Sequence, residues 1–211
     1  MIQDQDQLQH VGEECPVGDE NCPHFRELQK LREENQELAA LVRTDELTGL
    51  FNFRYFYQAV ELEMERSRRS DVPTVLIMLD LDHFKEVNDE YGHEVGNLAL
   101  NYIAKILRNT IRRLDIPCRY GGEEFALILP DTPLSSGVMF ANRLRLLIES
   151  SRIDIHGKEI KVTASFGVDV YKKGDNCTAK EFIDRADSYL YDAKSEGRNQ
   201  VKHPAFDINK D

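Results

Sequence analysis

Residues 119–130, RYGGEEFALILP, place a pair of carboxylates at the tip of a predicted β-hairpin. Gly121 and Gly122 favour a tight two-residue turn, because both positions can adopt positive φ. Glu123 and Glu124 follow directly, ahead of a strongly apolar strand. Glycine backbone without a side chain also lets a phosphate group approach closely. The segment therefore joins acidic side chains to open backbone, a combination that suits a phosphorylated ligand.

A further acid, Asp80, ends the apolar run of residues 75–79. A continuous run of this kind predicts a buried central strand, which holds the carboxylate at its end in a defined place. If this strand neighbours the strand at residues 125–130, Asp80 and Glu123 converge at one edge of the sheet. Converging carboxylates suit Mg²⁺, which takes oxygen ligands and shares them with substrate phosphates. The spacings alone are also compatible with solvated acids in two separate turns.

The composition predicts one globular domain with a short appendage. The chain has 211 residues, of which 41% are hydrophobic and 31% are charged. Its net charge of −11 argues against broad nucleic-acid binding, which needs a basic surface. The longest apolar run, residues 74–79, is too short to span a bilayer, and the N-terminus lacks the pattern of a secretory signal. We therefore expect a cytoplasmic protein without nucleic-acid or membrane partners.

Helical and extended patterns alternate through residues 44–203. Helices are predicted at residues 55–70, 96–114, 133–150 and 182–194, the last behind a capping box of Thr178 and Glu181. Strands are predicted at residues 74–80, 116–120 and 125–130, with two more between 153 and 171 on either side of a turn at His156-Gly157. We expect an α/β domain with about five strands and helices packed on them.

Residues 25–43 predict a dimerising helix. They contain no Gly or Pro, and Leu28, Leu31, Asn35, Leu38 and Val42 repeat at the a and d spacing of a coiled coil. An Asn at an a position favours a parallel two-stranded register. The pattern spans few heptads, so a single amphipathic helix lying on its own domain is the alternative.

The predicted organisation is a flexible segment at residues 1–24, the helix at 25–43 and a domain at 44–211. Cys15, Cys22 and His24 lie in the first segment. Their spacing is loose for a zinc site, so incidental thiols are favoured over a metal or redox site shared between two chains.

Four ordered motifs resemble those of the GGDEF family, the diguanylate cyclases. The hairpin RYGGEEF is similar to the GGEEF form of the family signature. Residues 45–56, 80–97 and 186–199 resemble its first motif, its nucleotide-binding segment and its C-terminal helix and turn, although Phe53 stands where a second Arg is common. The resemblance covers nearly all of residues 44–203. It implies a central, mostly antiparallel five-stranded sheet surrounded by helices, and the conversion of two GTP into cyclic di-GMP and two pyrophosphates.

The resemblance also implies a catalytic site with two metal ions, Mg²⁺ or Mn²⁺. Asp80, Glu123 and the Leu81 carbonyl would bind the metal. Glu124 would help to activate the attacking 3′-hydroxyl. Asp82 is a weaker metal candidate, which strand alternation would place on the side of Asp80.

The substrate-binding residues implied by the resemblance are Phe84, Lys85, Asn88, Asn97, Gly121, Gly122, Lys194 and Arg198. Phe84 and Lys85 open a short helix, so their backbone N–H groups can face an anion. Lys194 and Arg198 match the family's triphosphate-binding cations. Without the resemblance they are ordinary charges near a helix C-terminus.

Guanine recognition is where the sequence departs from the family pattern. The resemblance assigns it to Asn88 and to position 97, which is usually Asp but is Asn97 here. A carboxylate can accept from both N1–H and N2–H of guanine, whereas an amide offers one carbonyl acceptor. We expect weaker GTP affinity or looser base choice, on the order of 1 kcal/mol.

Arg112 and Asp115 match the family's RxxD inhibitory site for the product cyclic di-GMP, and Arg143 fits its second arginine. An Arg offers a planar fork for phosphate and guanine edges, and the Asp accepts from guanine. From the residues alone, a surface ion pair at i, i+3 is the alternative.

Each chain would bind one GTP, so a homodimer through the N-terminal helix would bring two sites face to face. No sensory domain fits into the first 24 residues, so control would be constitutive or come through the cysteine segment or a partner. Three alternatives to this reading are a degenerate receptor for GTP or cyclic di-GMP, a coiled-coil dimer with an inert domain, and a cyclase with relaxed base choice.

Overall fold

The computed structural model describes residues 27–32, 43–155 and 157–206. Two compact units are separated between Val42 and Arg43. Residues 27–32 are helical, and Leu28 and Leu31 within them are half exposed. The other positions of the predicted coiled coil, and the segment with Cys15, Cys22 and His24, lie outside the described residues.

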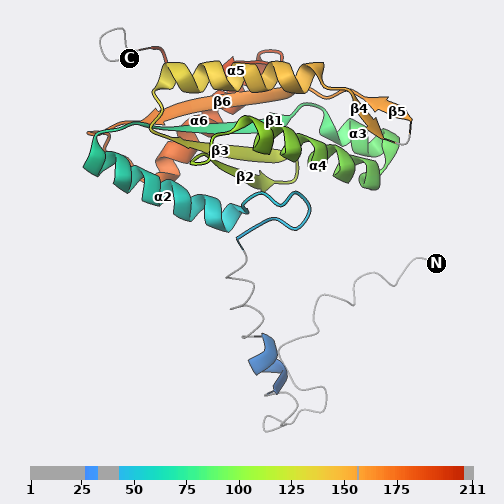
Figure 1. Cartoon of the computed structure of the whole chain (residues 1–211), viewed down its shortest axis with the longest axis horizontal. Coiled ribbons are helices and arrows are strands. Elements are labelled where there is room, and N and C mark those ends of the chain that lie inside the picture. The colour runs from blue at the N-terminus through green and yellow to red at the C-terminus, as the bar shows by residue number, and fades with distance from the viewer. Residues whose placement is uncertain (1–26, 33–42, 156, 207–211) are drawn as a thin grey trace, which may run out of the picture. The chain divides into compact units, whose positions relative to one another are not determined.

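The second unit is built on a five-stranded sheet with the strand order β2-β3-β1-β6-β7 (Figure 1). Neighbouring strands are antiparallel, except for the β6–β7 pair, which is parallel. The expected mostly antiparallel five-stranded sheet is confirmed. The strands are β1 Thr74–Leu81, β2 Ile116–Gly121, β3 Glu124–Pro130, β6 Ala164–Tyr171 and β7 Val201–Lys202.

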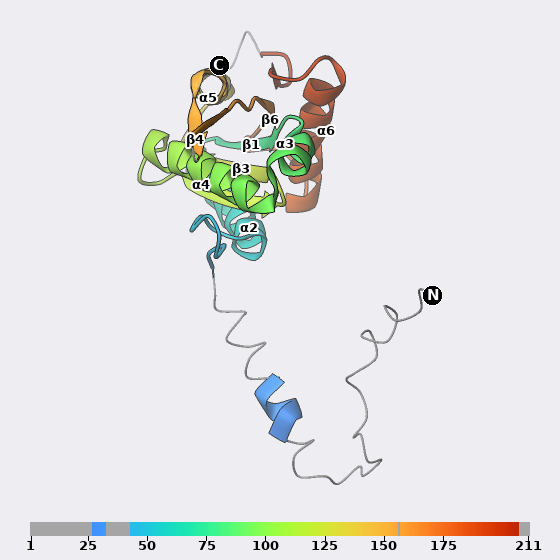
Figure 2. The same ribbon diagram turned by 90° about the vertical axis from the view of Figure 1, so that its right-hand side faces the viewer.

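Helices cover both faces of this sheet. The described helices are α2 Phe53–Ser70, α3 Phe84–Tyr91, α4 His93–Thr110, α5 Leu134–Ser150 and α6 Ala179–Ser195. Alternate residues of β1 contribute to two cores: Val75, Ile77 and Leu79 pack with α4 and α5, while Leu76 and Met78 pack with α2 and α6. Figure 2 shows α4 and α6 on opposite sides of the sheet. Because both faces are covered, β1 is buried along its whole length, as its apolar sequence predicts.

The C-terminal helix lies unusually close to the sheet. Gly167 on β6 permits this approach, since a Cβ atom there would clash with the backbone of Ala186 and Leu190 in α6. The capping box of Thr178 and Glu181 starts α6 as predicted. The helix is thereby held along the sheet, and its last turn reaches the end of β1.

Residues 153–171 form three strands where the sequence predicted two. β4 Ile153–Ile155 and β5 Lys158–Ile160 make a separate two-stranded hairpin, and only β6 joins the central sheet. Gly157, in the predicted turn between β4 and β5, has φ +77°. The segment after Ile160 does not continue the β4–β5 hairpin but leads into β6. The alternating pattern of residues 153–171 therefore contributes strands to two different sheets.

The hairpin at the GGEEF segment turns one residue later than expected. Gly121 is still in β2 and pairs with Glu124, so the two turn residues are Gly122 and Glu123. Neither glycine has positive φ, and the prediction of a Gly-Gly turn in that conformation was wrong. A register shift between Arg119 and Gly121 takes up the difference.

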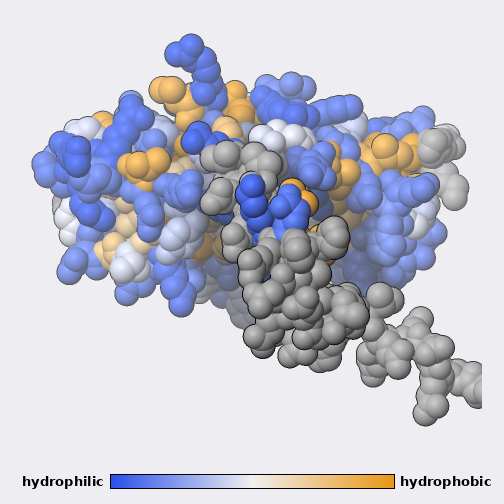
Figure 3. All heavy atoms as spheres, turned by 90° about the horizontal axis from the view of Figure 1, so that it is seen from below, coloured by the Kyte–Doolittle hydropathy of each residue, from blue (hydrophilic) through white to orange (hydrophobic). Residues whose placement is uncertain are grey.

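No helix in the described part of the chain is both long enough and apolar enough to cross a membrane. The face shown in Figure 3 is mainly hydrophilic, with apolar side chains in small separate groups.

Candidate functional site: a carboxylate edge with two flanking cations

The end of β1 and the start of β3 bring the predicted acids to one edge of the sheet. Asp80 lies directly across from Glu124 in the antiparallel register. Glu123 precedes Glu124 in the turn, and its carbonyl accepts a hydrogen bond from the Leu81 N–H at 3.3 Å. Asp80, Leu81, Glu123 and Glu124 therefore come together, and the cross-strand partner of Asp80 is Glu124 rather than Glu123.

Two cations from the C-terminal region face this edge. Lys194 in the last turn of α6 places its Nζ 2.7 Å from Asp80 Oδ2. Arg198, in the turn after α6, is close enough for its charge to lower the pKa of Asp80. Helix α6 thus supplies positive charge at the point where β1 and β3 supply negative charge.

Burial dominates the electrostatics of the two carboxylates. It raises the pKa of Asp80, and the hydrogen bond and charge of Lys194 oppose that shift. Burial also raises the pKa of Glu124, and the negative charge of Asp80 raises it further. A cation bound beside these two partly desolvated acids would offset both shifts, because it favours the charged form of each.

The donor set suits a metal that shares its ligands with a substrate. Among the described residues, no three His, Cys, Asp or Glu side chains are grouped to hold a metal by themselves. Mg²⁺ in phosphate-processing sites is commonly held by one or two carboxylates plus substrate phosphates. The edge offers Asp80 and the two glutamates of the hairpin tip for such an arrangement.

The predicted phosphate- and base-binding residues lie on α3 and α4. α3 begins at Phe84 and Lys85, with His83 before it at φ +56°. The buried ring of Phe84 anchors the helix start, while Lys85 is exposed. Because α3 starts three residues after Leu81, its N-terminus lies close to the end of β1, where an anion site would need it.

α3 and α4 cross closely at the residues expected to read the base. A Cβ atom at Gly96 would clash with the Asn88 side chain, so only glycine lets Asn88 lie there. Asn97 follows Gly96 and is exposed. The two asparagines are thus neighbours at the helix crossing.

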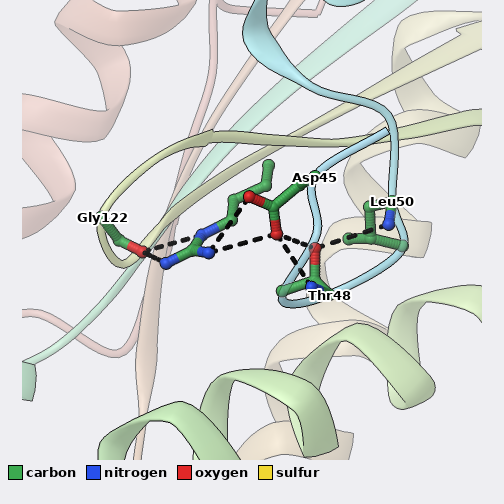
Figure 4. Close-up of polar contacts among 5 residues, drawn as sticks. Asp45, Thr48, Leu50 and Gly122 are labelled. Carbon is green, nitrogen blue, oxygen red and sulfur yellow. Dashed lines mark hydrogen bonds and ion pairs between the residues drawn. The ribbon is translucent and has the colours of Figure 1, made fainter. Parts of the chain in front are cut away.

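A clamp that the sequence reasoning missed holds the other side of the hairpin (Figure 4). The Arg119 guanidinium donates through Nε and one terminal nitrogen to the Gly122 carbonyl, at 3.1 and 2.9 Å. Its other terminal nitrogen donates to both oxygens of Asp45, at 3.1 and 3.2 Å. Asp45 also accepts from the N–H and the hydroxyl of Thr48. Both charged residues lie within the motifs quoted above, but nothing in their spacing indicates that they pair.

Asp82 lies close enough to Asp80 for its charge to raise the pKa of Asp80, but its own carboxylate is bonded to the protein. It follows the last residue of β1, so strand alternation no longer determines its direction. Oδ1 accepts from the Ser165 hydroxyl, and Oδ2 accepts from the Thr163 hydroxyl and the Asn199 N–H. Its role as a metal ligand, the weaker candidate in the sequence, stays a prediction.

The predicted inhibitory residues line one small cavity of about 120 Å³. α4 ends at Thr110, earlier than predicted, so Arg112 and Asp115 lie in a turn instead of on a helix. In that turn the Arg112 N–H donates to Asp115 Oδ2 at 2.7 Å. Arg143 from α5 stands over the ring of Phe140 and faces the same cavity. Burial raises the pKa of Asp115, and its bond and charge interaction with Arg112 oppose this.

Known proteins are similar to this chain in sequence and architecture. A family model described as "Diguanylate cyclase, GGDEF domain" matches residues 42–200. Response regulator PleD of Caulobacter vibrioides is 39% identical over 163 residues, which are 76% of this chain and 36% of that protein. Diguanylate cyclase A of Treponema denticola is 37% identical over 170 residues, which are 79% of this chain and 46% of that protein. The chain therefore spans less than half the length of these two relatives.

Two solved structures illustrate the match in three dimensions. The coiled coil and GGDEF domain of DgcB from Caulobacter crescentus, in complex with c-di-GMP, has a TM-score of 0.73 at 28% identity, covering 86% of this chain and 95% of that chain. Diguanylate cyclase SiaD from Pseudomonas aeruginosa, in complex with its activator SiaC, has a TM-score of 0.73 at 36% identity, covering 86% and 69%.

Proposed function

The chain belongs to the GGDEF family of diguanylate cyclase domains, and from this premise we propose that it condenses two GTP into cyclic di-GMP with release of two pyrophosphates. The observation that carries the proposal is the carboxylate edge: Asp80 and Glu124 face each other beside Lys194. Burying these charges costs free energy, which favours an active enzyme over a degenerate family member that would not use them.

The acids divide the work of the proposed reaction. Asp80, Glu123 and the Leu81 carbonyl would hold divalent metal, Mg²⁺ or Mn²⁺ and two ions per site. Bound metal would supply charge stabilisation for the attacking and leaving oxygens. Glu124 would accept the proton of the 3′-hydroxyl as that oxygen attacks the α-phosphorus of the second GTP. Its raised pKa makes its carboxylate a stronger base than an exposed glutamate.

Substrate binding would use the surroundings of the same edge. The amides at Phe84 and Lys85 and the side chains of Lys194 and Arg198 would bind the triphosphate, where positive charge balances that of the phosphates. Gly121 and Gly122 leave the hairpin backbone open to the same groups. Asn88 and Asn97 would read the guanine edge.

Each domain would present one GTP, so the reaction needs two copies of the chain. We propose a homodimer joined through residues 25–43, with control by product through the cavity of Arg112, Asp115 and Arg143. GTP is a cytoplasmic substrate, so the reaction would occur in the cytoplasm. The Arg112→Ala variant would then turn over GTP without product inhibition, and inhibition that persists in the variant would contradict this site.

The direct test is to incubate the purified protein with Mg²⁺ and GTP, and to identify the products by mass. Cyclic di-GMP and pyrophosphate in a ratio of one to two would support the proposal. Bound nucleotide without turnover would instead make the chain a receptor, with Arg112 and Asp115 as its functional residues.

Asn97 favours a second candidate, a cyclase with relaxed base choice. The amide has one acceptor for the two donors of guanine, and its NH₂ can donate to adenine N1. Incubation with GTP and ATP together would give mixed cyclic dinucleotides beside cyclic di-GMP. The Asn97→Asp variant should suppress the mixed product and lower the Michaelis constant for GTP about fivefold, since one hydrogen bond is worth about 1 kcal/mol. An unchanged constant and an unchanged product ratio would remove this candidate.

A further inference from the structure

Asp82 is buried, with 5% of its surface exposed, and every hydrogen bond it accepts comes from inside the domain. Oδ1 accepts from the Ser165 hydroxyl at 2.6 Å. Oδ2 accepts from the Thr163 hydroxyl at 2.7 Å and from the Asn199 N–H at 3.1 Å. The first two donors belong to β6 and the segment before it, whereas Asn199 belongs to the turn after α6.

That turn has an unusual backbone. Gly197, Arg198 and Asn199 all have positive φ, at 119°, 63° and 44°. Positive φ is uncommon for residues other than glycine, and for Arg it persists only where the surroundings enforce it. A charged hydrogen bond from Asp82 to the last of these residues is such a constraint.

The turn carries one of the two cations of the carboxylate edge. Arg198 is the residue before Asn199, and its own N–H is bonded to the Ala193 carbonyl at 2.9 Å. The Asn199 side chain is held separately, by Glu149 and Arg145 of α5. Asp82 therefore fixes the backbone on the C-terminal side of Arg198, while α6 fixes it on the N-terminal side.

We infer that Asp82 is a positioning residue that holds the Arg198 turn in place for the triphosphate of the substrate. The inference rests on the proposed function for the nature of the ligand. Asp80 and Asp82, two residues apart, then have separate tasks: Asp80 faces the reacting groups, and Asp82 faces the protein and acts through Arg198. Three of the roughly four lone-pair positions of the Asp82 carboxylate already accept from donors of the protein.

The Asp82→Asn variant tests this role. The amide nitrogen of Asn can take the place of Oδ1 and donate to the Ser165 hydroxyl, so the partners can stay bonded, but the bond from the Asn199 N–H loses its negatively charged acceptor. The weaker bond predicts a rise of about tenfold in the Michaelis constant for GTP, with kcat at saturating GTP and Mg²⁺ within about threefold of wild type. A large fall in kcat together with a higher Mg²⁺ requirement would show that Asp82 is a metal ligand and would overturn the inference.

A double-mutant cycle with Arg198→Ala separates positioning from general damage. Affinity is measured calorimetrically with Mg²⁺ and 3′-deoxy-GTP, which binds without being able to condense. If Asp82 acts through Arg198, Asp82→Asn has no further effect in the Arg198→Ala background. Additive losses would overturn the inference, because Asp82 would then act independently of Arg198.

Asp169→Asn is a matched control. Asp169 is also a buried β6-associated carboxylate, 4% exposed, and it pairs with Arg185 at 2.7 Å. Its substitution should disturb stability but leave nucleotide affinity unchanged. Equal loss of affinity in both variants would mean that any damage to the sheet produces the effect, and would contradict the inference.

Hydrogen exchange of residues 197–200 provides a readout that does not depend on the reaction. Exchange there should be about tenfold faster in Asp82→Asn and unchanged in Asp169→Asn, since only the first weakens the bond from the Asn199 N–H. Should Asp82→Asn not fold, the milder Thr163→Val removes one partner of Oδ2 and should speed the same exchange two- to threefold. Unchanged exchange would overturn the inference.

A wild type that neither turns over GTP nor binds the analogue would overturn the proposed function instead. Exchange would still decide whether Asp82 holds the turn.

Discussion

The hairpin tip lies between two carboxylate sites with opposite electrostatics. On one side, Asp45 accepts from Thr48, and both of its oxygens accept from Arg119. Arg119 also donates to the Gly122 carbonyl. Although partial burial opposes it, these donors lower the pKa of Asp45. On the other side, burial raises the pKa values of Asp80 and Glu124, and the negative charges of Asp82 and Asp80, respectively, raise them further.

The difference shows which site is complete within the protein. The Arg119–Asp45 clamp has its donors, so its charge stabilises the fold. The Asp80–Glu124 edge has Lys194 as its one ion-pair partner among the described contacts, so it lacks positive charge that a metal and substrate would supply. A rigid clamp beside an electrostatically strained edge is the arrangement expected where the fold positions groups for chemistry.

The largest expected effect comes from the strained edge. Glu124→Gln should lower kcat on the order of 10³-fold through loss of the general base, while the Mg²⁺ requirement stays near wild type. The free energy of unfolding should rise by about 0.5 kcal/mol, because two like charges no longer face each other across the strands. Activity and urea unfolding measure the two quantities. A variant that is both active and less stable would contradict the comparison.

Breaking the Arg119–Asp45 clamp should instead lower stability strongly and kcat only moderately. Arg119→Gln removes the ion pair with Asp45 and frees the Gly122 carbonyl, so we expect a loss of about 2 kcal/mol in unfolding free energy and about tenfold in kcat. Arg119→Lys, as the matched variant, keeps the charge but not the fork, and should recover only part of each. Full recovery by Lys would show that charge alone matters and that the hairpin does not need the bidentate geometry.

The two sites should also give opposite pH dependence of stability. The lowered pKa of Asp45 means that its contribution is complete above its ordinary value of 3.8 and is lost as the pH falls through the lower folded value. Asp45→Asn should therefore be less stable than wild type at neutral pH, with a deficit that shrinks below that value. Glu124→Gln should be more stable at neutral pH, and its advantage should vanish as the pH falls through the raised pKa towards 4.5. Chemical unfolding of both variants at several pH values provides the measurement, and two curves of the same sign would refute the contrast.

The smallest expected effect is at the edge of the clamp. Thr48→Val removes the hydroxyl that donates to Asp45 at 2.7 Å but keeps the backbone N–H donor and the shape of a buried side chain. Unfolding free energy should fall by about 1 kcal/mol, with kcat unchanged within twofold. A tenfold loss of activity would mean that Thr48, and not Arg119, is the link to the hairpin tip.

Much of the fold follows from local patterns in the sequence. The apolar run ending at Asp80 predicted the central strand, and helical periodicity predicted the helices, because burial on one or both faces repeats at fixed spacing. Predictions failed where the same local sequence is compatible with more than one turn position or strand pairing. The hairpin turns at Gly122-Glu123, and residues 153–171 divide between two sheets, because pairing partners, and not composition, decide these points.

The sequence by itself determined the family, the antiparallel α/β architecture and the identity of the acids and cations expected at the site. The tertiary structure alone decided how they are grouped: Glu124 across from Asp80, Arg119 on Asp45 across 74 residues, and Asp82 on Asn199 across 117 residues. The reason is physical. Periodicity and motifs record which face a residue occupies, whereas a hydrogen bond between distant segments depends on strand register and helix placement, which arise only when the whole core packs.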